Sequence, residues 1–280
     1  MKKPGEVFCR EFLLIVLWFS SLSLAAQSFR SPAQSAYLLS VTGFPQAPSP
    51  LSVSSSPSLI PGTASFMAGV YAENQYGISG LNALQAGLSI ARKHQGGGVH
   101  FTYLGNTGYH ELAIGLHYGR SLGKINIGLG FRYHQFSSPG LQTNGALAYT
   151  ISSSWKFTEN ISGAISLTNP FVPGARPEAS IAPLYALSFG FGISEQVFVE
   201  SRIIKEEGRN LQPSVGMHYR VQEKFDFYAG CWPFYFRLFL SLGWNWWGIC
   251  LQVTINYQPS LGASPGLLMI YASTPKSREE

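Results

Sequence analysis

The chain has little charge, since only 12% of its 280 residues are Asp, Glu, Lys or Arg, whereas a soluble domain carries about 25%. Beyond its first 26 residues it also lacks any uninterrupted apolar run of the length that a membrane-spanning helix needs. Apolar residues nevertheless make up 45% of the sequence, together with 30 glycines. This combination indicates that a large apolar surface faces lipid in some form other than helices.

Other absences exclude partners and chemistry. The net charge of +5 is scattered, so a nucleic-acid partner is not expected. The six histidines have no ligand spacing, and no metal or other cofactor is expected. Ser214 and His218 lie too far apart on one predicted strand to form a nucleophile and base, so the chain is not expected to be an enzyme. Cys231 and Cys250 are predicted to be free, on opposite strand faces.

The N-terminus predicts export. Lys2, Lys3 and Arg10 precede the apolar run 12–19, and small residues follow at 23–26. This order is typical of a cleaved signal peptide, residues 1–26, with an uncleaved anchor as the alternative. Residues 27–64 are rich in Ser and Pro and cannot bury enough apolar surface to fold alone. They are expected to be either a periplasmic tether or a plug inside a lumen.

From residue 65 to 273 the sequence alternates between apolar residues and polar residues or glycine. In 123–136, for example, aliphatic and aromatic residues occupy the odd positions from Ile125 to Tyr133. Segments of 9 to 13 residues with this period are typical of strands that cross a bilayer in a barrel. The prediction is an all-β, antiparallel, up-and-down transmembrane barrel in the outer membrane, with about 14 strands (12–16 possible) and a polar tail at 274–280. The expected strands are 65–74, 82–93, 97–106, 109–120, 123–136, 142–155, 159–169, 182–193, 195–205, 210–222, 224–233, 236–246, 248–257 and 264–273.

The connections alternate in length and so predict orientation. Short ones, such as 121–123 and 194–195, belong on the periplasmic side, and longer ones, such as 169–182 and 258–263, belong outside. The connection at 232–234 is an exception.

The hairpin Glu111–Tyr133, with Tyr118-Gly119-Arg120-Ser121-Leu122-Gly123 at its turn, resembles outer-membrane barrels of the PorV/PorQ type from Bacteroidota-type bacteria, which are distantly related to FadL-like transporters. The segment 161–169 resembles a later strand of the same family. Two features differ: Ser56-Pro57-Ser58 stands where the family has Asn-Pro-Ala, and a polar tail follows the last strand.

The resemblance implies one of two functions. A PorV/PorQ-like protein would be an accessory or docking component of type IX secretion or envelope assembly, with other outer-membrane proteins and lipid as partners. The alternative is a FadL-like transporter or porin that passes small hydrophobic or anionic solutes. A plug at 27–62 would favour the transporter, and a free segment would favour docking.

Two groups of side chains are candidate sites. The first is a polar lumen lining, interpreted as an anion-preferring pore or as a network of paired charges; its members are His117, Lys124, Arg132, His134, Glu200, Arg202, His218 and Arg220. The second is an aromatic cluster at strand ends, interpreted as an interfacial girdle rather than a ligand platform; its members are Trp232, Trp244, Trp246, Trp247 and Tyr257.

Overall fold

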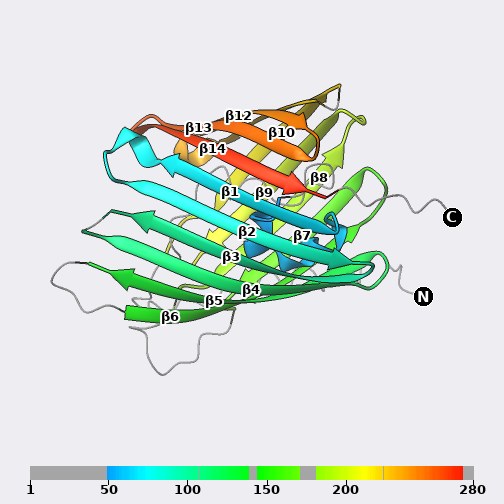
Figure 1. Ribbon diagram of the computed structural model, residues 1–280, viewed down its shortest axis with the longest axis horizontal. Coiled ribbons are helices and arrows are strands. Elements are labelled where there is room, and N and C mark those ends of the chain that lie inside the picture. The colour runs from blue at the N-terminus through cyan, green and yellow to red at the C-terminus, as the bar shows by residue number, and fades with distance from the viewer. Residues whose placement is uncertain (1–48, 107, 139–143, 171–180, 223, 274–280) are drawn as a thin grey trace, which may run out of the picture.

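The computed structural model describes residues 49–106, 108–138, 144–170, 181–222 and 224–273. Within these ranges, fourteen antiparallel strands close into one barrel, in which each strand pairs with its neighbours in the sequence and β1 pairs with β14 (Figure 1). No helix in this part of the chain is long and apolar enough to cross a membrane. The strands are β1 Phe66–Asn74, β2 Asn82–Arg92, β3 Gln95–Gly105, β4 His110–Ser121, β5 Ile125–Ser137, β6 Asn144–Lys156, β7 Ile161–Thr168, β8 Leu184–Gly192, β9 Val197–Glu206, β10 Gln212–Val221, β11 Phe225–Trp232, β12 Arg237–Trp246, β13 Ile249–Gln258 and β14 Gly262–Ala272.

The predicted all-β barrel is therefore confirmed, and each strand ends within two residues of its expected bounds. The predicted signal peptide, the first part of the Ser/Pro-rich segment and the polar tail lie outside the described residues.

Alternation decides which side chains face lipid. Along β5 the odd positions, from Ile125 to Tyr133, point outward and are exposed, while Gly128, Gly130, Arg132 and His134 are buried in the interior. The other strands repeat this pattern and surround the barrel with exposed aliphatic and aromatic side chains. Because the closed ring leaves no strand edge unpaired, the backbone can cross hydrocarbon without unsatisfied polar groups. The wall is that of an outer-membrane barrel.

The two ends of the barrel differ in their connections. At one end the turns range from two residues, Lys93–His94, to four, such as Phe157–Asn160. The connections at the other end include 75–81 and 169–183. Short turns mark the periplasmic end. One expected long connection is wrong: β13 and β14 pair as far as Gln258 and Gly262, so only Pro259–Leu261 joins them.

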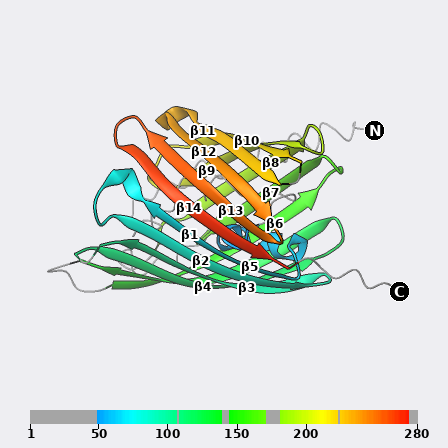
Figure 2. The same cartoon turned by 45° about the horizontal axis from the view of Figure 1, so that its top comes forward.

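The interior holds part of the chain that precedes the barrel. Two short 3₁₀ helices, η1 (Ser52–Ser54) and η2 (Pro57–Gly62), lie inside the ring of strands (blue in Figure 2). They contact the inner faces of β2 to β6. The lumen is thus partly filled, and this filling defines the candidate site.

Candidate functional site: the lumen and the segment inside it

We call residues Ser49–Gly62 the luminal segment. Its serines hold its backbone in tight turns: the Ser52 hydroxyl donates to the Ser49 carbonyl at 2.7 Å, and the Ser54 hydroxyl donates to the Leu51 carbonyl at 2.9 Å. Proline at the first position of η2 suits a helix start, because it has no N–H to leave unsatisfied. The segment is buried along most of its length. It therefore lies inside the barrel as an ordered segment.

Hydrogen bonds from the wall hold the luminal segment in place. The Ser58 backbone N–H donates to the Ser152 hydroxyl of β6 at 2.8 Å, and the Ser154 hydroxyl donates to the Ser58 carbonyl at 3.3 Å. Further along, the Ser166 hydroxyl of β7 donates to the Ser55 carbonyl. The Ser58 N–H lies in the first turn of η2, where it has no acceptor within the helix, so the wall supplies one.

Glycines on the inner wall give the segment its room. A Cβ at Gly119 would lie 2.5 Å from the Pro57 carbonyl oxygen, and one at Gly87 would lie 2.8 Å from the Pro50 carbonyl oxygen. At Gly128 a Cβ would overlap the backbone of Ser58. These close approaches are to backbone atoms, which cannot move aside alone. Small residues in β2, β4 and β5 therefore form the seat of the luminal segment.

Apolar contacts complete the seat. Ile60 is fully buried in a cluster with Val53 and Ala91. Leu51 joins a second, larger cluster on the other side of the lumen. Burial of three aliphatic side chains contributes on the order of several kcal/mol. It explains how a Ser/Pro-rich segment, which cannot fold alone, becomes ordered inside the barrel.

A basic cluster lies beside the segment on β3, β4 and β5. His100 Nδ1 lies 2.6 Å from His117 Nε2, so one ring donates and the other must accept. The Arg132 guanidinium, 7% exposed, donates to the Ser54 carbonyl. His134 is two residues further along β5 and is also buried. Arg132 thus connects the basic cluster to the luminal segment.

Toward the outer end of the barrel, a second part of the chain covers the inner face of β6. Ile181, in the connection between β7 and β8, is buried against the inward-facing Ala146 and Ala148 of β6. The Asn169 side chain steadies this connection, because it donates to the Ile181 carbonyl at 3.0 Å and accepts from the Tyr149 N–H at 2.9 Å. Chain therefore enters the lumen from both ends.

The opposite wall carries a buried apolar and aromatic cluster. Tyr228 and Phe239 stack with their ring centroids 5.4 Å apart, and Trp232 lies at the end of the same strand as Tyr228. The cluster is formed by inward-facing residues of β1, β9, β11, β12 and β14. Its large buried members on these strands are Met67, Tyr71, Phe198, Ile204, Tyr228, Trp232, Phe239, Leu268 and Ile270. An apolar lining of this size is unlike the fully polar lumen of a porin.

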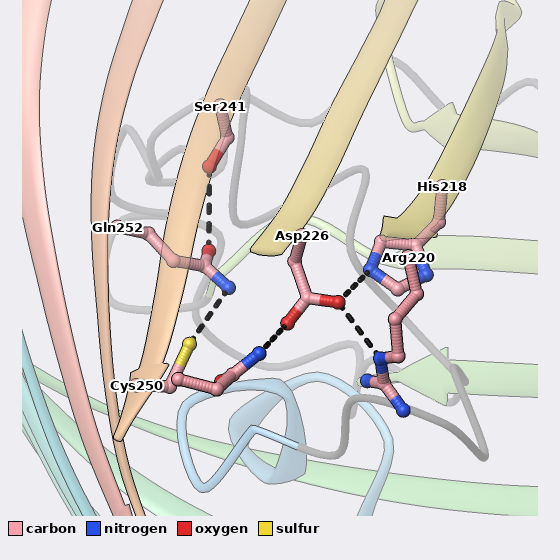
Figure 3. A network of polar contacts seen from close by, with 7 residues as sticks. His218, Arg220, Asp226, Ser241, Cys250 and Gln252 are labelled. Carbon is pink, nitrogen blue, oxygen red and sulfur yellow. Dashed lines mark hydrogen bonds and ion pairs between the residues drawn. The ribbon is translucent and has the colours of Figure 1, made fainter. Parts of the chain in front are cut away.

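A polar network, drawn in Figure 3, is centred on the periplasmic ends of β10 and β11. Asp226 of β11 is its centre: Arg220 Nε donates to it at 2.9 Å, and His218 Nε2 lies 3.2 Å away. The Asn245 amide also donates to Asp226. Ser241, Gln252 and Cys250 continue the network on β12 and β13. The carboxylate of Asp226 is therefore compensated from several strands.

The predicted lumen residues separate into three groups. His117, Arg132 and His134 belong to the basic cluster, and His218 and Arg220 belong to the Asp226 network. Glu200 and Arg202 are buried two residues apart on the inner face of β9. Lys124 was placed wrongly: β5 begins at Ile125, and Lys124 is exposed in the β4–β5 turn, where Gly123 has a φ of 84°.

The aromatic girdle also needs one correction. Trp244, Trp246 and Trp247 stack at the periplasmic end, and Tyr257 is exposed near the outer end. Trp232, however, is 1% exposed and packs in the luminal cluster. It shares an inward phase with Asp226 and Tyr228, six and four residues earlier in β11. A position near a strand end does not settle which face a side chain takes.

The residues considered for catalysis and metal binding are placed as follows. Ser214 and His218 lie four residues apart on β10, roughly 13 Å along the strand. Among the described residues, no group of three or more His, Cys, Asp or Glu side chains is arranged to hold a metal ion. Cys231 and Cys250 are free, and Cys250 belongs to the luminal network.

Comparison with known proteins finds solved β-barrel structures of similar fold. No family model matches the sequence, and no curated protein is significantly similar to it. Among solved structures, a FadL homologue from Pseudomonas aeruginosa has a TM-score of 0.58 at 8% identity, covering 87% of this chain and 98% of that one. The CymD monoaromatic hydrocarbon channel has a TM-score of 0.57 at 10% identity, covering 78% and 91%. The outer membrane protein Omp33 of Acinetobacter baumannii has 0.51 at 9%, covering 75% and 98%.

At such identities the likeness shows the fold: this chain has the fold of an outer-membrane β-barrel. The finer resemblance to PorV/PorQ-type proteins finds no support in these comparisons and stays a prediction.

Proposed function

We propose that the protein is a gated outer-membrane channel for small solutes that are largely apolar, with the luminal segment as its gate. The observation that carries this proposal is the seat of Ser49–Gly62 inside the barrel, bonded through Ser58 to Ser152 and Ser154. The segment is held by a few hydrogen bonds and three buried aliphatic side chains and is not part of the wall. It can therefore leave the lumen while the barrel stays closed, as a gate must.

The lining supports an apolar solute. Tyr71, Tyr228, Trp232 and Phe239 are buried in one cluster inside the barrel. Leu51 of the luminal segment packs in the same cluster, so movement of the segment would expose aromatic side chains to a solute. Aromatic side chains bind apolar and aromatic ligands through large contact areas. CymD, a barrel of similar shape, is a monoaromatic hydrocarbon channel, which agrees with this choice of solute class.

Uptake of a small radiolabelled aromatic hydrocarbon tests the proposal. The full-length protein is produced in cells whose own outer membrane admits the hydrocarbon slowly. We expect faster accumulation with the wild-type protein than with an empty vector, and a smaller gain with Phe239→Ala, which removes part of the aromatic lining.

Purification in mild detergent tests the alternative, a docking function. A barrel that leaves uptake unchanged and is recovered in stoichiometric complexes with other envelope proteins would contradict the channel and favour the PorV/PorQ-like docking function.

A further inference from the structure

The outer wall has a hollow among its lipid-facing side chains. A groove of about 390 Å³ lies over β4 to β7, and its lining includes Tyr118, Ile127, Leu129, Ile151 and Ile165. Ser153 is the cause: it points outward between Ile127 and Ile165, its partners on the two neighbouring strands, where the wall otherwise carries larger apolar residues. The groove is thus apolar and faces hydrocarbon.

Exposed cations lie at the periplasmic edge of this groove. Arg120 pairs with Ile127 across the β4–β5 ladder, so its backbone is level with the groove lining. Lys124 lies in the β4–β5 turn, and Lys156 is the last residue of β6 beside it, because the Lys156 N–H donates to the Lys124 carbonyl at 3.2 Å. All three side chains are exposed. No ion pair involves any of them within the part of the chain that the structure describes.

The charge of this edge is one-sided. The three neighbouring turns from β2 to β7 and the strand ends beside them also carry Arg92 and Lys93, against a single acidic residue, Glu159. The remaining short turns lack such an excess: Arg220 is paired with Asp226, and the β12–β13 turn is Trp247-Gly248. The basic patch therefore coincides with the groove.

We propose that Arg120, Lys124 and Lys156, together with the groove around Ser153, bind one anionic phospholipid of the periplasm-facing leaflet. The phosphate lies against the three cations, and one acyl chain fills the groove. The spacing fits this arrangement, because the groove begins at Ile127, two residues from the strand end and roughly 7 Å above the turn. Cation clusters at a membrane surface select anionic headgroups.

Native mass spectrometry tests the site. The full barrel is released from detergent after incubation with equal amounts of phosphatidylglycerol and phosphatidylethanolamine that have identical acyl chains. We expect the wild-type protein to retain one phosphatidylglycerol with a preference of about tenfold, and the triple variant Arg120→Gln, Lys124→Gln, Lys156→Gln to lose that preference. A control variant, Lys205→Gln, Arg209→Gln, Lys224→Gln, removes the same charge elsewhere and should keep it.

A second variant tests the groove separately. Ser153→Phe fills the hollow from the lipid side without changing charge, and it should lower retention of phosphatidylglycerol while the barrel stays folded, as judged by heat-dependent migration in gels. Equal retention of the two lipids by the wild-type protein would overturn the proposal. So would undiminished retention of phosphatidylglycerol in the triple variant.

Discussion

Single residues on the inner wall determine where the luminal segment sits. Gly128 of β5 and Ser152 of β6 pair directly across the ladder, and both touch Ser58: one offers space and the other accepts its N–H. The contact joins positions 94 residues apart in the sequence. A side chain added at position 128 would therefore displace Ser58, whereas the hydroxyl at position 152 holds Ser58 in place.

Gly128→Val should displace the luminal segment, because its side chain would overlap the Ser58 backbone. The measurement is labelling of Ser58→Cys by a water-soluble maleimide, in a background with Cys231→Ser and Cys250→Ser. Ser58 is fully buried, so labelling should be slow in the parent and faster after Gly128→Val. Gly97→Val is the matched control, since a Cβ there meets only the His117 carbonyl at 3.5 Å. Equal labelling in all three proteins would refute the seat.

Two tryptophans should differ sharply in their contribution to stability. Trp232→Ala leaves a cavity in the luminal cluster and should lower the free energy of unfolding by about 3–5 kcal/mol. Trp247 is 87% exposed, and Trp247→Ala should cost about 1 kcal/mol or less. Urea-induced unfolding in phospholipid vesicles measures both values. Similar losses for the two variants would place Trp232 in the girdle after all.

The sequence predicted for some of these residues, but not for all, whether the side chain faces the interior. Alternation assigned Arg132, His134 and His218 to the interior, because the strand period is two and their neighbours are aliphatic. Trp232 was assigned by its nearness to a strand end, and its phase relative to Asp226 was the signal that would have corrected it. The Ser58–Ser152 contact had no local signal, because it depends on how the closed barrel places its plug.

At the scale of elements, the pairing of the first and last strands closes the barrel. β1 pairs with β14 from Met67↔Ala272 to Glu73↔Gly266, and Ser273 extends the contact by donating its N–H to the Phe66 carbonyl at 2.9 Å. Without this pair, β1 and β14 would expose unpaired backbone groups to lipid, which costs several kcal/mol for each group.

Truncation after Gln258 should therefore abolish the folded barrel, since it removes all of β14. Truncation after Ser273 should leave the barrel intact, because every described strand pair is retained. Heat-dependent gel migration and far-ultraviolet circular dichroism of the refolded proteins distinguish the two outcomes. A compact, heat-modifiable barrel from the shorter chain would contradict the closure.

The elements themselves were the most predictable feature. Each strand alternates over a length that suits a tilted crossing, so its existence and approximate bounds follow from local sequence. The connection at Pro259–Leu261 was expected to be longer, because Ala263 and the residues beside it carry no strong strand signal and pair only through their neighbours in β13.

At the scale of the whole molecule, the barrel combines an apolar outer wall with a lumen that chain enters from both ends. The luminal segment covers the glycine-rich wall near the periplasmic side, and Ile181 covers β6 toward the outside. Between and opposite them lie the basic cluster and the aromatic lining. The proposed passage of solutes through the barrel therefore requires that the luminal segment move, because the segment narrows the lumen along β2 to β6.

Conductance across planar lipid bilayers is the most direct test of that requirement. The intact chain is compared with a variant that lacks Ser49–Gly62, each inserted as a folded barrel under the same salt and voltage. We predict small or absent current steps for the intact chain and larger, stable steps for the shortened one, because removing the segment opens the glycine-lined side of the lumen. Identical current steps for the two proteins would contradict a plug at this position.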